Sequence, residues 1–214
     1  EITASKENCD VVLNMVYENG TAQVTGEAKN AAVTDVLAMY PDLKHIKVTS
    51  GVIPTVNIAA SKDRDGWHIR LDGKPRNLSG QFFGMAFTEG EGSFTADRDK
   101  TDLHTLQANV NGMPVLLRGT IKSRRATPLP PGFDLKFSAG YFKTQALSKG
   151  LNLDDASVEF SGKLTGTAVE PKIEGNFRSN YLYAAPLQMN NLHGEFVWDS
   201  GKLVLTVAAK ESVE

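Results

Sequence analysis

Apolar residues recur at every second position through most of this chain, with polar residues between them. Successive side chains of a β-strand point to opposite faces of a sheet, so this period predicts strands with one apolar and one polar face. We therefore expect an all-β protein. The alternating apolar positions, two of them glycines, are Trp67, Ile69, Leu71, Leu106, Ala108, Val110, Phe133, Leu135, Phe137, Val158, Phe160, Ile173, Gly175, Phe177, Leu192, Gly194, Phe196, Trp198, Leu203, Leu205 and Val207.

Short turn sequences lie between the alternating segments. A glycine at positive φ closes a tight hairpin, and an asparagine or aspartate before it strengthens this interpretation. With strands spaced at about 8 to 12 residues, the turns predict an antiparallel meander. The periodicity does not decide between a sandwich, a barrel and an open curved sheet. The four turns are Asn19-Gly20, Asp65-Gly66, Asn111-Gly112 and Ser200-Gly201.

Residues 30–40 depart from the alternation. Their apolar residues are spaced at i, i+3, i+4 and i+7, with Asn30 as a candidate N-cap and Pro41 as the residue that stops the helix. We expect a short amphipathic helix that covers an end or edge of the sheet, because an exposed edge invites uncontrolled pairing. The four apolar positions of this helix are Val33, Val36, Leu37 and Tyr40.

The composition is that of a chain that folds. Its 214 residues can bury a sizeable core, and 41% apolar with 22% charged residues excludes wholesale disorder. A formal net charge of −2 argues against a nucleic-acid partner and gives no attraction to anionic membrane surfaces. The basic cluster of Lys122, Arg124 and Arg125 is interpreted as a solvated strand end.

The proline-rich stretch at residues 128–131 is the best internal boundary. It divides the chain into residues 1–127, which include the short helix, and residues 132–214. Because the alternation resumes directly after it, the two parts are expected to form one continuous sheet.

Cysteine usage and targeting sequences give little information. The one cysteine, Cys9, has no internal partner for a disulfide. No apolar run approaches the roughly 18 residues that span a bilayer, and the N-terminus carries neither a signal peptide nor an initiating methionine. We expect a processed or excised fragment whose anchor lies elsewhere in a larger protein.

Residue types that carry catalysis or bind metals are dispersed. A zinc site needs three or four convergent ligands, and the histidine spacing provides none, so the histidines are interpreted as exposed strand residues. Residues 63–66 resemble half of a calcium loop without its closing glutamate, and residues 97–102 are interpreted as an acidic loop tip. We expect no enzyme, no metal and no cofactor. The histidines are His45, His68, His104 and His193.

The last third of the chain contains an ordered set of short motifs. A Leu-x-Gly-Thr strand is followed by a turn closed by proline and an Ile-x-Gly strand; then come a Leu-x-Gly-x-Phe strand, an aromatic residue, a glycine turn and a Leu-x-Leu strand. Over residues 155–209 this order resembles the TamB and AsmA-like family. The matching residues are Leu164, Gly166, Thr167, Pro171, Ile173, Gly175, Leu192, Gly194, Phe196, Trp198, Gly201, Leu203 and Leu205.

The resemblance implies a long antiparallel sheet curled into an open groove, a β-taco, that is apolar inside and polar outside. It implies a bridge-like lipid carrier in the periplasm, with the parent protein anchored in the inner membrane of a two-membrane bacterium. Phospholipid acyl chains would be its cargo. Family members are linked to phospholipid movement and to outer-membrane protein assembly, so an Omp85-type barrel is an expected partner of regions outside this chain.

Acyl chains fit such a groove physically. About fourteen strands at roughly 4.8 Å give a sheet on the order of 65 Å, and each CH₂ kept from water contributes roughly 0.8 kcal/mol. The predicted lining residues are Phe133, Leu135, Phe137, Phe160, Leu164, Ile173, Phe177, Phe196, Trp198, Leu203, Leu205 and Val207.

Two alternatives stay open at this stage. The same apolar side chains can pack against a second sheet, which would make a closed β-sandwich that serves as a secreted binding or adhesion module. A folding chaperone that adds client strands to an exposed edge is also compatible with the groove. Glycines within or beside the strands favour a strongly curled sheet; they are Gly162, Gly166, Gly175 and Gly194.

Overall fold

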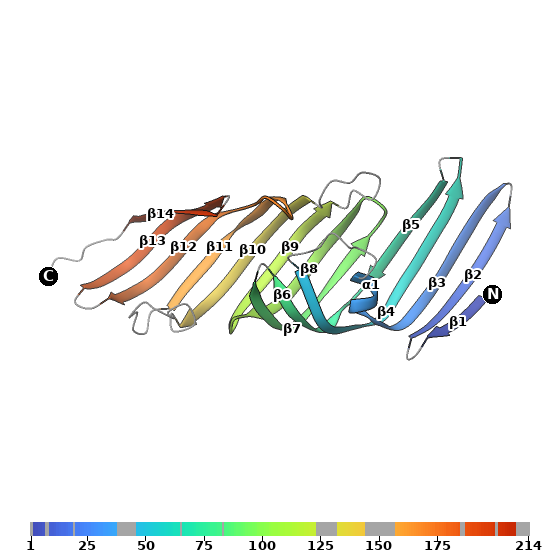
Figure 1. The fold of residues 1–214 in the computed structure, drawn as a ribbon, viewed down its shortest axis with the longest axis horizontal. Coiled ribbons are helices and arrows are strands. Elements are labelled where there is room, and N and C mark those ends of the chain that lie inside the picture. Colours follow the sequence, from blue (N-terminus) through green and yellow to red (C-terminus); the bar gives the residue numbers. More distant parts are fainter. Residues whose placement is uncertain are drawn as a thin grey trace.

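The protein is one large antiparallel β-sheet, which confirms the predicted fold class. The computed structural model describes residues 2–6, 9–18, 20–37, 46–64, 66–82, 84–122, 132–143, 157–184, 187–199 and 201–208. Figure 1 shows an elongated layer with β1 and β14 at opposite ends and the short helix α1 beside β4.

Fourteen strands make up the sheet. Their bounds are β1 Ile2–Lys6, β2 Cys9–Glu18, β3 Thr21–Ala32, β4 Ile46–Asp63, β5 Gly66–Gly73, β6 Arg76–Phe82, β7 Met85–Ala96, β8 Lys100–Val110, β9 Met113–Lys122, β10 Gly132–Lys143, β11 Ser157–Thr167, β12 Pro171–Ala184, β13 Leu187–Asp199 and β14 Lys202–Ala208.

The strands follow one another in chain order except around β6. β4 is the longest strand, and it pairs with β6 along its first part and with β5 along its second part. β7 in turn pairs with both β5 and β6. The two short strands β5 and β6 therefore lie between the same two neighbours, β4 and β7.

The helix starts later than the sequence predicts. α1 spans Val33–Leu37, and Asn30 is not its N-cap but a residue of β3 with a φ of 57°. The pairing of β3 with β4 passes from Lys29 directly to Ala31, and Asn30 lies between these positions. Strand pairing through Ala32 thus displaces the predicted start of the helix. Tyr40 and Pro41 lie outside the described residues.

The glycine turns are confirmed as hairpins. Gly20, Gly66, Gly112 and Gly201 all have positive φ and join consecutive strands, whereas Asn19, Asp65 and Ser200 lie outside the described residues. A fifth hairpin was not predicted: Phe82 pairs with Met85 around Gly84, whose φ is 80°.

The stretch at residues 128–131 lies outside the described residues, but the sheet is continuous across it. β9 and β10 pair directly from Lys122 opposite Gly132 to Val115 opposite Ala139. No domain boundary therefore interrupts the hydrogen-bonded sheet between these two strands.

Directly paired residues project from the same face of a sheet. One lateral row of such pairs runs through thirteen strands, all except β6, and every member is apolar or glycine. We call the face that carries this row the inner face. The row is Ala4, Val11, Ala28, Val56, Gly73, Phe94, Leu103, Gly119, Leu135, Leu164, Ile173, Trp198 and Leu203.

The buried residues of the inner face form three clusters rather than one core. The first lies around β4, where Val33 of α1 and Leu78 of β6 join Ile53 and Val56. The other two lie in the C-terminal part, one around Phe133, Leu135, Leu164 and Ala168, the other around Val158, Phe177 and Leu192. The sheet is therefore covered in patches.

Candidate functional site

The twelve predicted lining residues all lie on the inner face. They occupy five consecutive strands, β10 to β14, and the register places them in adjacent lateral rows. The odd or even position of each residue along its strand therefore predicted correctly on which face of the sheet it lies. The row from Leu135 to Leu203 holds five of them, and the others are Phe133, Phe137, Phe160, Phe177, Phe196, Leu205 and Val207.

Solvent exposure of these residues rises toward β14. Phe133, Leu135, Leu164 and Phe177 are buried. Five are partly buried: Phe137, Phe160, Ile173, Phe196 and Trp198. On β14 Leu203 is 58% exposed, and Leu205 and Val207 are also more than half exposed. The C-terminal end of the inner face is therefore an open apolar surface.

Four phenylalanines from neighbouring strands form an aromatic cluster on this surface. Phe160 lies 5.8 Å from Phe196 in an edge-on arrangement and 6.3 Å from Phe177, measured between ring centroids. Phe137 lies 6.4 Å from Phe196. Such geometries add about 0.5–1.5 kcal/mol per pair beyond area burial. The cluster links β10, β11, β12 and β13 through side chains as well as through backbone hydrogen bonds.

Glycines opposite the phenylalanines make room for the rings. Phe137 is paired with Gly162, Phe196 with Gly175 and Phe177 with Gly194. A Cβ atom at Gly175 would lie 2.9 Å from the Phe196 ring, and at Gly194 it would lie 2.6 Å from the Phe177 ring. Each ring therefore lies over the neighbouring backbone, which keeps it close to the sheet.

The family-like turn between β11 and β12 is closed by local hydrogen bonds. The N–H of Thr167 donates to the carbonyl oxygen of Glu170 at 3.1 Å, and the N–H of Glu170 donates to Thr167 Oγ1 at 3.1 Å. Gly166 has a φ of 84°, which disfavours any other residue there. Pro171 then begins β12 opposite Gly166.

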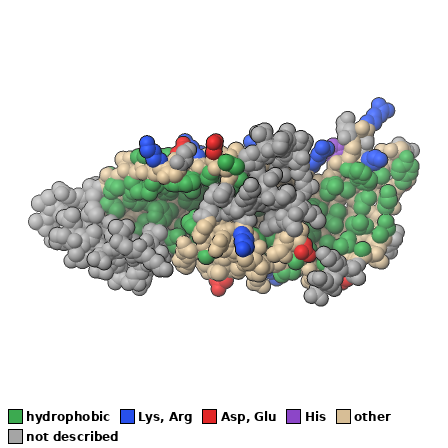
Figure 2. All heavy atoms as spheres, viewed as in Figure 1, with side chains coloured by type: hydrophobic (Ala, Val, Ile, Leu, Met, Phe, Trp, Pro, Cys, Tyr) green, Lys and Arg blue, Asp and Glu red, His purple; other side chains and the backbone are tan. Residues whose placement is uncertain are grey.

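A second open apolar surface lies at the N-terminal end and was not predicted as part of the site. Figure 2 shows hydrophobic side chains gathered over the end that holds β1 to β5, and a hollowed hydrophobic field over the C-terminal strands. Val11, Leu13, Met15 and Tyr17 alternate on the inner face of β2, and this alternation could have revealed it. Exposed inner-face residues at this end are Ile2, Met15, Tyr17, Trp67 and Ile69.

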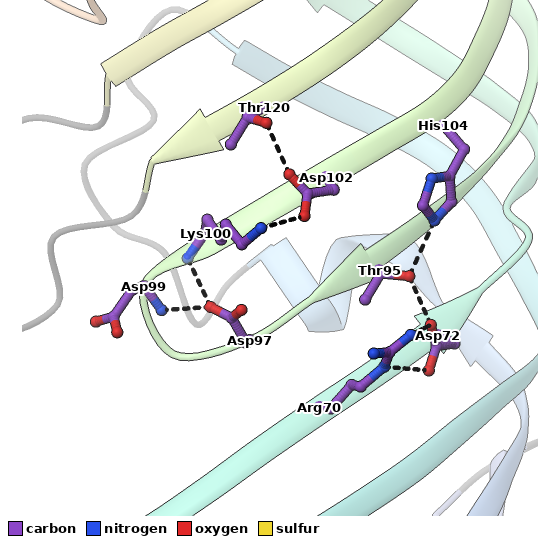
Figure 3. Close-up of polar contacts among 9 residues, drawn as sticks. All are labelled: Arg70, Asp72, Thr95, Asp97, Asp99, Lys100, Asp102, His104 and Thr120. Carbon is purple, nitrogen blue, oxygen red and sulfur yellow. Dashed lines mark hydrogen bonds and ion pairs between the residues drawn. The ribbon is translucent and has the colours of Figure 1, made fainter.

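Polar side chains of the opposite, outer face form a ladder of hydrogen bonds across β5, β7 and β8 (Figure 3). Arg70 donates two hydrogen bonds to the Asp72 carboxylate, at 3.1 and 3.2 Å. Thr95 Oγ1 donates to Asp72 at 2.6 Å and lies 2.9 Å from His104 Nε2. The hydrogen bond from Arg70, followed by that from Thr95, lowers the pKa of Asp72 from its ordinary value of 3.8.

A parallel contact set joins β8 to β9. Lys100 Nζ donates to Asp102 at 2.6 Å, and Thr120 Oγ1 donates to the other carboxylate oxygen at 2.7 Å. These two bonds, with that from Lys100 the larger, lower the pKa of Asp102. Both carboxylates are therefore held ionised and take part in cross-strand bonds that stabilise the outer face.

The residues considered for metal binding are not brought together. His68, His104 and His193 are exposed on different strands, and His45 lies outside the described residues. Among the parts of the chain that the structure describes, no group of three or more histidine, cysteine or acidic side chains converges on one point. Asp63 pairs with Gly66 to close the β4–β5 hairpin.

The segment predicted as an acidic loop tip, residues 97–102, is only partly a loop: residues 97–99 form a tight turn between β7 and β8, and β8 begins at Lys100. The Asp97 carboxylate accepts hydrogen bonds from the N–H groups of Asp99 and Lys100, at 2.8 and 2.9 Å. The first carboxylate of the loop thus serves to hold its backbone.

No family model, curated protein or solved structure matches this chain. None of the helices within the described ranges is long and apolar enough to cross a bilayer.

Proposed function

We propose that this chain is a segment of a TamB/AsmA-like envelope protein whose inner face carries phospholipid acyl chains between two membranes. The single observation that carries the proposal is the lateral row from Ala4 to Leu203, which crosses thirteen strands without a polar side chain. At roughly 4.8 Å per strand the row extends about 58 Å, several times the length of half a bilayer core.

An acyl chain can slide along the sheet only if the apolar row is continuous. An acyl chain moving along the row exchanges one apolar contact for the next, so no CH₂ group, worth roughly 0.8 kcal/mol, returns to water on the way. Transfer by this route needs no chemical step and no cofactor. The polar ladder of Asp72 and Asp102 on the other face keeps that side in water.

Exposure at both ends of the inner face also supports a carrier rather than a packed core. Leu203 and Leu205 at one end, and Met15 and Tyr17 at the other, are all more than half exposed. A closed sandwich would need a second sheet over these residues, and within the described ranges all fourteen strands belong to one sheet. In the parent protein the location would be the periplasm, with outer-membrane protein assembly as a further process served by the same groove.

Two adjacent residues of β14 provide a matched test. Leu205 and Val204 are 52% and 58% exposed but lie on opposite faces of one strand, since Leu205 is paired with Phe196 and Val204 with Val197. The measurement is binding of a phospholipid with a fluorescent acyl chain to the purified chain. Leu205→Asp is expected to weaken binding at least tenfold and Val204→Asp to leave it within twofold. Equal effects of the two substitutions, or no binding by the unaltered chain, would refute the lipid groove.

A further inference from the structure

β5 is paired along only part of its length on the side away from β4. Its last residues, Leu71, Asp72 and Gly73, pair with Ala96, Thr95 and Phe94 of β7. β7 ends at Ala96, and the chain turns back through Asp97 into β8. Within the described ranges, no strand pairs with Trp67 or Ile69 on that side.

The register of the β4–β5 hairpin shows which N–H and C=O groups of β5 point toward the side where no strand is paired. Asp63 and Gly66 close the β4–β5 turn, and in such a turn the N–H of the last residue bonds back to the first. Backbone groups alternate in direction along an antiparallel strand. The N–H and C=O groups of Trp67 and Ile69 therefore point away from β4, in line with those of Leu71, which meets β7.

The apolar rows stop at the same place. Met15, Val24, Ala60 and Ile69 are paired in one inner-face row that ends at β5, whereas the adjacent row through Leu71 continues across the sheet. Trp67 and Ile69 are 41% and 46% exposed. One strand beside β5 would extend the interrupted row.

A surface hollow borders the open part of β5. A cavity of about 640 Å³ is lined by residues of β3, β4 and β5 and by the turn that follows β7. Ile69 and Arg70 lie on one side of it, and Asp97, Arg98 and Asp99 line it from the turn. The cavity thus touches both the open part of β5 and the point where β7 leaves the sheet.

We propose that the open part of β5 is a strand-addition site, which binds an extended polypeptide antiparallel to β5 with apolar residues opposite Trp67 and Ile69. The occupant is a polypeptide and not a lipid, because another backbone can pair with the alternating outward N–H and C=O groups, whereas an acyl chain has no donor or acceptor to offer them. The site is the backbone edge of β5, although the side chains of Trp67 and Ile69 belong to the inner face that is proposed above to carry lipid. It needs no bound lipid, and it selects its partner by alternation and not by a particular sequence.

The probe is a capped hexapeptide of alternating valine and threonine with one cysteine at a valine position. It is offered to chains that carry Cys9→Ser and one new cysteine, under conditions that allow reversible disulfide exchange. Ile69→Cys is compared with Val24→Cys, which lies in the same inner-face row but is paired on both sides. Trapping at Ile69→Cys is expected to exceed trapping at Val24→Cys at least tenfold. Equal trapping, or trapping only at Leu205→Cys on the terminal strand, would overturn the assignment.

Two backbone changes test the hydrogen bonds themselves. Ile69→Pro removes the outward N–H and is expected to lower binding of a fluorescein-labelled hexapeptide about tenfold, whereas Ile69→Val keeps the N–H and most of the side chain and should bind normally. A peptide N-methylated at alternate residues should bind at least tenfold more weakly than its parent, which keeps the test valid even if Ile69→Pro disturbs folding. Unchanged binding of the N-methylated peptide would contradict strand addition, as would full binding by a folded Ile69→Pro variant.

Discussion

Two parts of the inner face both carry apolar side chains but differ in how far those side chains are buried. Around β4, Ile53 is 2% exposed, and it shares a cluster with Val33 of α1 and Leu78 of β6. On β14, Leu203 and Leu205 also belong to the inner face but are more than half exposed. Alternation therefore determines which side chains share a face, whereas the path of the chain determines whether that face becomes core or surface.

The largest expected difference is in stability. Ile53→Ala leaves a cavity in the covered part and is expected to lower the free energy of unfolding by about 2–5 kcal/mol. Leu205→Ala removes a side chain that is already half in water and should cost less than about 1 kcal/mol. Urea unfolding of both variants measures the difference. Equal losses would mean that β14 is as covered as β4 and would end the distinction between the two parts.

The glycines of the C-terminal part give the next largest effect. A Cβ at Gly175 would overlap the carbonyl oxygen of Ser161 and crowd Phe196, so Gly175→Ala should destabilise by roughly 1–3 kcal/mol. Gly132→Ala is the matched control, because its nearest neighbour would lie 3.6 Å away, and it should change stability by no more than about 0.5 kcal/mol. The comparison is made by thermal unfolding. A neutral Gly175→Ala would show that close approach of the strands is not required there.

The aromatic cluster predicts a smaller, pairwise effect. Phe160 and Phe196 meet edge-on at 5.8 Å, so a double-mutant cycle with Phe160→Leu and Phe196→Leu should give a coupling free energy of about 0.5–1.5 kcal/mol. Phe160→Leu with Ile69→Val, two substitutions at distant ends of the sheet, is the control cycle and should be additive within about 0.5 kcal/mol. Absence of coupling in the first cycle would mean that the rings merely share a surface.

The smallest expected effect comes from the polar ladder. Asp72 and Asp102 have folded-state pKa values below the ordinary 3.8, so their contribution is complete above pH of about 4 and is lost as the pH falls through the folded-state values. The melting temperature should therefore decline below pH of about 4, and less steeply in Asp72→Asn/Asp102→Asn. High salt should weaken the effect, because both pairs are solvent-exposed. The same dependence of melting temperature on pH in the double variant would show that the ladder does not contribute to stability.

Local sequence predicted most of the fold. Alternation located the strands that carry Phe133, Phe160 and Phe196, and the glycine turns joined them correctly, because consecutive antiparallel strands pair with their chain neighbours. The twelve lining residues shared one face for the same reason: the strands that carry them pair without a register shift between these positions.

The pairing of strands that are distant in the sequence, and the burial of parts of the inner face, could not be predicted in this way. β4 pairs with β3, β5 and β6. Its pairing with β6 contains register shifts near Ser50, and no pattern in the local sequence predicts them. Asn30 looked like a helix cap because its neighbours are spaced like a helix, yet pairing of β3 with β4 continues past it. The N-terminal surface was missed because Val12 and Val16 place apolar residues on the outer face and obscure the period.

The most direct measurement is site-specific photocrosslinking in cells, in the intact parent protein, with the photoreactive residue at Leu203, Leu205 or Phe160 and with Val204 and Arg178 as outward controls. Val204 is as exposed as Leu203 and Arg178 is also exposed, so accessibility alone does not separate the two sets. The account predicts phospholipid adducts at the three inner positions and none at the controls. Protein adducts alone at the inner positions, or lipid adducts equally at Val204, would contradict it.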